Sequence, residues 1–107
     1  MKTLLVDAVF SFVDEKGVIN KPLYELLETF ENTKIILTGA NDEQMKTFGL
    51  EAVPYEVFTL RHDPEKTDPE YYREMLLHYG LSTEDVVYFE HDEKAVESAR
   101  SVGIQTF

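Results

Sequence analysis

Two residues with catalytic potential stand where short apolar runs end. Asp7 follows residues 4–6, and a carboxylate at such a point can attack a phosphoryl or acyl group or hold Mg²⁺ through oxygen. Thr38 follows residues 35–37 and precedes a glycine, where a hydroxyl and the N–H groups of a helix start can bind an anion. Each residue also has a structural interpretation, as a polar group that caps the next turn.

A lysine and an acidic cluster are the other two candidates. Lys66 lies in a polar loop ahead of a helix, where an ammonium can neutralise phosphate beside a carboxylate nucleophile. Glu90, His91 and Asp92 follow an apolar run and open a helix. Two carboxylates and an imidazole can ligate a metal or supply a general base. The alternatives are a solvated lysine, and helix capping by Asp92 with its two neighbours in solvent.

Apolar runs alternate with amphipathic segments along the whole chain. Strands are predicted at residues 4–6, 34–38, 57–60, 85–89 and 104–107, and helices over about 21–30, 42–48, 69–79 and 93–102. Residues 10–19 contain a turn signal at 14–17 and predict a small flap hairpin. The alternation predicts an α/β fold with a mainly parallel sheet and helices on both faces. Ligands of such sheets bind beyond the carboxyl ends of the strands, where all four candidates lie.

The composition describes an acidic, soluble protein. The 107 residues are 43% apolar and suit one domain over 1–107. With 10 basic and 21 acidic residues the formal charge is −11, which disfavours nucleic acid and anionic membranes as partners. The absence of cysteine excludes disulfides and thiolate metal sites. Without a membrane-spanning run or a signal-peptide pattern, the expected location is the cytoplasm.

The order of these motifs resembles that of the haloacid dehalogenase (HAD) superfamily. Residues 4–9 match its first motif at Asp7, residues 35–38 its second, residues 66–72 its lysine motif, and residues 87–92 with the helix over 96–104 its fourth. The resemblance covers nearly the whole chain. It implies a three-layer Rossmann-like domain, a five-stranded sheet in the order 5-4-1-2-3 and a flap after the first strand. Too few residues separate the motifs for a cap domain.

A Mg²⁺-dependent phosphohydrolase is the activity that this resemblance implies. The implied catalytic residues are Asp7 as nucleophile, with Thr38 and Lys66 holding the phosphate. The positions implied for Mg²⁺ are Asp7, Val9, Glu90, His91 and Asp92. The implied substrate is a phosphorylated small molecule or protein. The sequence carries no feature that sets an oligomeric state.

Two positions depart from the family's pattern. Val9 replaces the second aspartate, the general acid/base, and loss of such a group typically costs ~10²–10⁴ in rate. His91 replaces the aspartate that reaches Mg²⁺, and imidazole suits Zn²⁺ and other transition metals better. Two functions therefore stay open: a phosphohydrolase with weak or lost activity, and a non-catalytic domain that binds a ligand or a protein.

Two other activities fit the sequence less well. A response-regulator receiver also combines an acidic pocket with threonine and lysine, but its acceptor aspartate lies on the third strand, whereas Asp7 ends the first. A Ser/His/Asp hydrolase needs a nucleophile elbow, and none of the serines considered has that context: Ser11, Ser82, Ser98 and Ser101.

Overall fold

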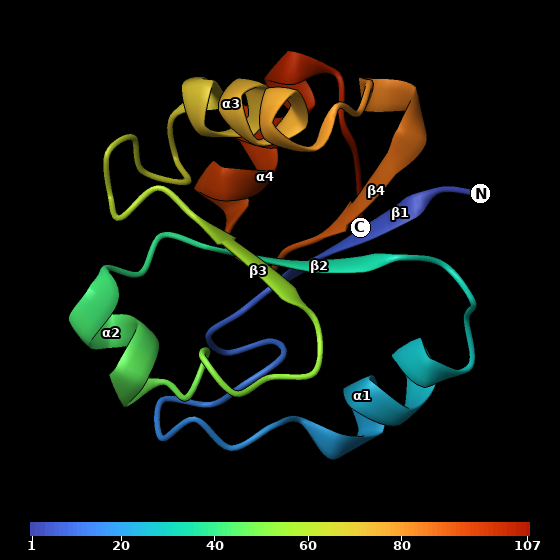
Figure 1. Ribbon diagram of the computed structural model, residues 1–107. Helices are drawn as coiled ribbons and strands as arrows, with labels where there is room; N and C mark the ends of the chain where they lie inside the picture. The colour runs from blue at the N-terminus through green and yellow to red at the C-terminus, as the bar shows by residue number, and fades with distance from the viewer.

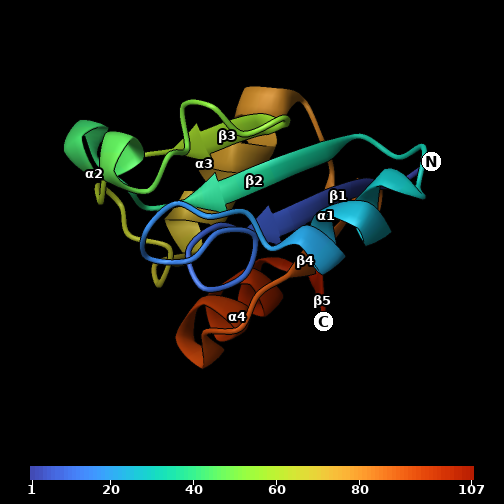
Figure 2. The ribbon, with the colours of Figure 1, turned by 90° about the horizontal axis from the view of Figure 1, so that it is seen from below.

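A central parallel sheet organises the computed structural model, which describes all residues from 1 to 107 (Figure 1). Its strands are β1 (Thr3–Asp7), β2 (Lys34–Thr38), β3 (Glu56–Thr59), β4 (Val86–Phe89) and β5 (Gln105–Thr106). They are ordered β3-β2-β1-β4-β5, and every neighbouring pair is parallel. This is the predicted order, and it places β1 in the centre. The carboxyl ends of the strands therefore share one rim of the sheet (Figure 2).

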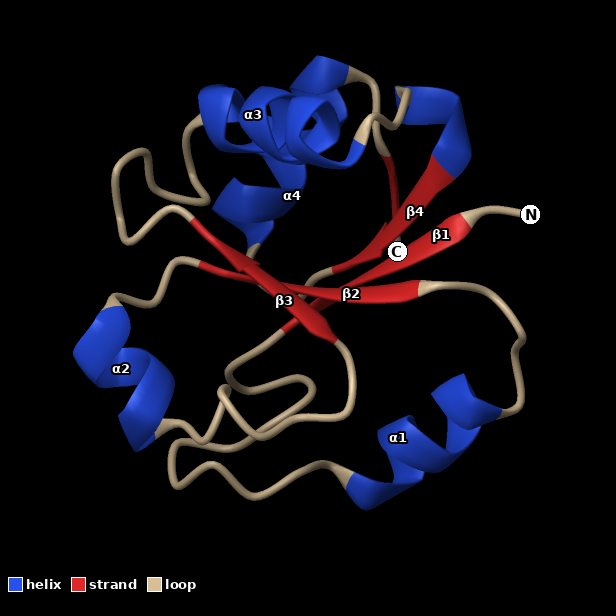
Figure 3. Ribbon diagram, in the orientation of Figure 1, coloured by secondary structure: helices blue, strands red, loops and turns tan.

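Helices cover both faces of the sheet, as predicted. Helices α3 (Pro69–Tyr79) and α4 (Glu93–Val102) lie on one face, and α1 (Lys21–Glu28) and α2 (Asp42–Thr47) on the other (Figure 3). A 3₁₀ turn at Thr83–Asp85 precedes β4. No helix combines the length and the apolar character needed to cross a membrane.

The sheet is buried on both sides, which explains its continuous apolar runs. Successive side chains of a strand point to opposite faces, so Leu5 packs with α3 and α4 while Val6 packs on the face of α1. The α3–α4 side carries the larger cluster, built on three buried tyrosines, Tyr71, Tyr72 and Tyr88. Both clusters stabilise the central strand, whose last residue is Asp7.

Capping residues set the helix ends where the sequence predicts them. The side chains of Asn20, Asp68 and Asp92 accept hydrogen bonds from the first turns of α1, α3 and α4. Asn41 and Gln44 form a reciprocal capping box at α2. At the other ends, Gly80 and Gly103 adopt the left-handed conformation that terminates a helix. Asn41, Asp68 and Asp92 thus fix the loops that leave the carboxyl rim, and the two glycines lead the chain back to the opposite edge of the sheet.

Some boundaries differ from prediction. Helix α1 ends at Glu28 and not at Phe30, because Thr29 closes its last turn and Phe30 lies outside the helix with 47% of its surface exposed. The flap after β1 has no hairpin ladder: it turns back on itself through one antiparallel bridge, between Val13 and Ile19. Phe12 and Val13 are buried from this loop, which anchors the flap against the core on the α1 side.

Candidate functional site

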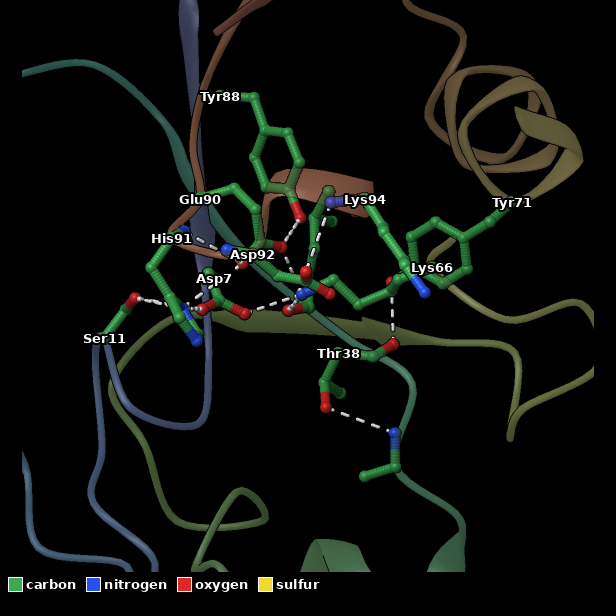
Figure 4. Close-up of polar contacts among 12 residues, drawn as sticks. Asp7, Ser11, Thr38, Lys66, Tyr71, Tyr88, Glu90, His91, Asp92 and Lys94 are labelled. Carbon is green, nitrogen blue, oxygen red and sulfur yellow. Dashed lines mark hydrogen bonds and ion pairs between the residues drawn. The ribbon is translucent and has the colours of Figure 1, made fainter. Parts of the chain in front are cut away.

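The four segments singled out from the sequence meet at the carboxyl rim of the sheet (Figure 4). Asp7 ends β1 and Thr38 ends the neighbouring β2, while Lys66 comes from the loop between β3 and α3. The Lys66 ammonium lies 2.6 Å from Asp7 Oδ1 and 2.7 Å from Glu90 Oε1, in the loop after β4. The parallel topology explains this meeting, because every strand ends on the same rim.

The two oxygens of Asp7 have different surroundings. The side chain is only 5% exposed. Oδ1 accepts a hydrogen bond from Lys66, whereas Oδ2 faces two groups, the Ser11 hydroxyl at 2.9 Å and Nδ1 of His91 at 2.5 Å. A carboxylate oxygen has two lone pairs. Oδ1 therefore keeps one acceptor position free, and Oδ2 has both occupied.

Glu90 is a buried structural carboxylate. Its side chain is 1% exposed, so the alternative interpretation, in which Glu90 lies in solvent, is wrong. Oε1 accepts from the Tyr88 hydroxyl and from Lys66, and Oε2 accepts from the backbone N–H groups of His91 and Asp92 at 3.1 and 3.3 Å. Burial raises the pKa of Tyr88, which keeps its hydroxyl protonated as a donor. Glu90 thus fixes both the loop after β4 and the Lys66 ammonium.

Two of the positions implied for the metal contribute no side-chain ligand to the cluster. Asp92 is exposed and accepts from the backbone N–H of Lys94 at 3.2 Å, which is the helix-capping role. Val9 has an apolar side chain, so only its backbone carbonyl could ligate. Asp7, Glu90 and His91 remain as a candidate metal cluster, with one donor atom each, all within 4.8 Å of one another.

A cavity of about 270 Å³ lies on the Thr38 side of Asp7, and Val9, Gly39 and Lys66 also line it. The Thr38 hydroxyl accepts from the backbone N–H of Ala40 at 3.1 Å, so it also caps the turn. The backbone N–H groups of Val9 and Gly39 donate to no acceptor in the chain. An ammonium and free N–H groups beside one another can hold an oxyanion.

A second, larger cavity of about 540 Å³ lies on the other side of Asp7. Its walls are Lys66, His91 in the loop after β4, and the start of α4 with Lys94. Asp7 and Lys66 thus stand between two cavities. No separate cap domain covers either one, because the connections after β1 and β3 contain only the flap with α1 and short loops.

Sequence reasoning missed two contributors to the site. Ser11 was considered only as a nucleophile, whereas its hydroxyl lies 2.9 Å from Asp7 Oδ2 and 3.3 Å from Nδ1 of His91. This is not a hydrolase triad, because Ser11 and Asp7 contact the same imidazole nitrogen. Tyr88 was predicted only as a strand residue. The signal for Tyr88 is its spacing, since it lies two residues before Glu90 on the same side of β4.

The fold is shared with solved structures of hydrolases. A HAD-superfamily hydrolase of subfamily IA from Geobacter sulfurreducens PCA superimposes with a TM-score of 0.75 at 13% identity, over 99% of this chain and 85% of that chain. A HAD family enzyme from Bacteroides thetaiotaomicron, in complex with magnesium and inorganic phosphate, gives a TM-score of 0.76 at 15% identity, over 100% of this chain and 93% of that chain. This chain has the HAD fold. No protein-family model and no curated protein matches its sequence.

The HAD fold raises the question of magnesium, and the residues present do not fit that ion. Mg²⁺ demands octahedral coordination by oxygen. Asp7 Oδ2 already faces Ser11 and His91, Glu90 is saturated with hydrogen bonds, and Asp92 caps α4. The position that the resemblance implies for a further oxygen ligand holds the imidazole of His91 instead, a nitrogen that transition metals accept more readily.

Proposed function

We propose that this chain binds the phosphate group of a phosphorylated small molecule or protein beside Asp7, and that it hydrolyses phosphomonoesters slowly. The observation that carries the proposal is the pairing of Asp7 with Lys66, 2.6 Å apart and largely buried, on the wall of a cavity shared with Thr38. The nucleophile is Asp7 Oδ1, the oxygen with a free acceptor position. Lys66 and the N–H groups of Val9 and Gly39 stabilise the phosphoryl oxygens.

The reaction has two displacements at phosphorus. Oδ1 of Asp7 attacks, the bond from phosphorus to the leaving oxygen breaks, and an aspartyl phosphate forms. The leaving oxygen takes its proton from water, because Val9 has none to give. Water then attacks the phosphorus, the bond to Oδ1 breaks, and inorganic phosphate departs. Both steps lack the general acid/base that Val9 replaces, at a cost of ~10²–10⁴ in rate.

The missing acid also selects among substrates. An alkyl phosphate releases a strongly basic oxygen that needs a proton as it leaves, whereas an aryl or acyl phosphate releases a weakly basic one. We therefore expect turnover of aryl and acyl phosphates to exceed that of alkyl phosphates. The open approach to Asp7 admits a phosphate group on a large molecule, since no cap domain covers it.

A second candidate is a non-catalytic phosphate-binding domain. Val9 favours it, because the chain lacks the general acid. The contacts of Oδ2 favour it as well, since Ser11 and His91 hold the carboxylate in place with hydrogen bonds that an attacking nucleophile does not need.

The deciding experiment measures turnover of an aryl phosphate, with and without divalent cations, for the wild type and two variants. Asp7→Asn keeps the size of the side chain and should abolish turnover. Glu97→Gln makes the same chemical change at an exposed residue of α4 and should leave turnover unchanged. Phosphate binding without turnover would select the second candidate. Absence of both binding and turnover, or turnover retained in Asp7→Asn, would refute the proposal.

A further inference from the structure

We infer that this site takes a divalent cation that accepts nitrogen ligands, such as Zn²⁺ or Co²⁺, in preference to Mg²⁺, and that His91 sets this preference. The inference concerns the site of the proposed function, and only the use of the cation in hydrolysis rests on that function. Binding of the metal alone tests it without any substrate.

The first support is the way two donors converge. Nδ1 of His91 lies 2.5 Å from Asp7 Oδ2, so the two atoms face each other across a shared hydrogen, and a cation that replaces this hydrogen would reach both once the imidazole moves back. Oε2 of Glu90 lies 3.4 Å from the same nitrogen, which puts a second carboxylate beside that position. A neutral imidazole that places its proton on Nε2 leaves Nδ1 free to ligate. His91 and Asp7 would be the direct ligands, and Glu90 would add negative charge from the side.

The second support is the local charge. Asp7 and Glu90 carry two negative charges in a largely buried setting, and Lys66 supplies one positive charge between them. A phosphate group adds further negative charge when it binds. The chain as a whole has a formal charge of −11, so its field attracts cations. A divalent cation at the Oδ2 side would balance the charges that Lys66 leaves uncompensated.

The third support is the accessibility and freedom of the nitrogen ligand. His91 is 50% exposed and lines the open cavity of about 540 Å³, so its ring can adjust and water can complete the coordination. The Val9 carbonyl accepts no hydrogen bond from the chain and remains available as a further oxygen. An imidazole nitrogen beside a carboxylate suits transition metals, whereas Mg²⁺ coordinates through oxygen and would gain nothing from His91.

The test measures binding of Zn²⁺, Co²⁺ and Mg²⁺ to the purified chain by calorimetry, with the visible absorption of Co²⁺ as a report on nitrogen coordination. The wild type should bind Zn²⁺ and Co²⁺ and show negligible binding of Mg²⁺. His91→Ala removes a direct ligand, so it should weaken Zn²⁺ binding by more than the roughly 10–100-fold that outer-shell partners cost. His91→Asp should exchange the preference, with weaker Co²⁺ and stronger Mg²⁺ binding.

His62 provides the matched control, because it too lies beside a carboxylate, with Nδ1 3.0 Å from Glu65. His62→Ala should leave the Zn²⁺ affinity and the Co²⁺ spectrum unchanged. The inference is overturned if Zn²⁺ binding survives in His91→Ala, if it depends on His62, or if Mg²⁺ binds the wild type as tightly as Zn²⁺. Circular dichroism of each variant verifies that it is folded. A chain that binds the metal as expected yet turns over no phosphate would refute the proposed hydrolysis and leave this inference standing.

Discussion

Replacement of Lys66 by methionine tests whether one ammonium holds the site together. The Lys66 side chain is 16% exposed and lies between the carboxylates of Asp7 and Glu90, which are 5% and 1% exposed. Lys66→Met keeps an unbranched side chain and removes the charge, so two buried carboxylates lose their common counter-ion. Breaking a buried ion pair from one side typically costs about 3–5 kcal/mol. Because Lys66 retains some contact with water, we expect the lower end, about 3 kcal/mol.

Urea unfolding followed by far-ultraviolet circular dichroism measures this loss. With a slope of about 1–3 kcal/mol per molar urea, the midpoint should fall by roughly 1–3 M. Lys94→Met is the control, since Lys94 is exposed at the start of α4 and should change stability by no more than about 0.5 kcal/mol. Adding Glu90→Gln to Lys66→Met should recover part of the loss, because one uncompensated charge disappears. If Lys66→Met behaved like Lys94→Met, the reasoning about the buried ion pairs would be refuted.

Two further predictions concern the missing acid and the buried tyrosines. Val9→Asp restores a carboxyl group beside the nucleophile. It should raise kcat by ~10²–10⁴ on an alkyl phosphate and by less on an aryl phosphate. Equal gains on both substrates would contradict the role of position 9 as the missing general acid. Burial is the main cause that raises the pKa of five tyrosines: Tyr55, Tyr71, Tyr72, Tyr79 and Tyr88. Above pH ~10 the unfolded chain releases phenolic protons that the folded chain keeps, so stability is complete below that pH and falls as the pH rises. Urea midpoints measured from pH 9 to 11 should decrease, and a constant midpoint would disprove this.

Local signals in the sequence located each helix and strand, although not every one of their ends. The β2 and α4 boundaries match the prediction to the residue, because a continuous apolar run sets the first, and Asp92 and Gly103 terminate the second. Such signals act within one or two turns of chain, so they can be read without knowledge of the fold. The prediction failed at the end of α1, where the apolar spacing reaches Phe30 but the helix stops at Glu28. Spacing alone does not establish that a side chain has a surface to pack against.

The sequence also predicted which residues gather at the rim, because parallel strands separated by helices must end on the same edge. Asp7, Thr38 and Lys66 were found from their places after predicted strands. Their order along the chain matched the order of the HAD motifs, which assigned each of them a role. Only the tertiary structure decided what each atom of the site contacts. It buried Glu90 under Tyr88 and Lys66, brought Ser11 back from the flap to Asp7, and placed His91 against one oxygen of the carboxylate. These contacts join residues up to 84 positions apart, and their distances depend on how strands and loops pack in three dimensions, which no local pattern encodes.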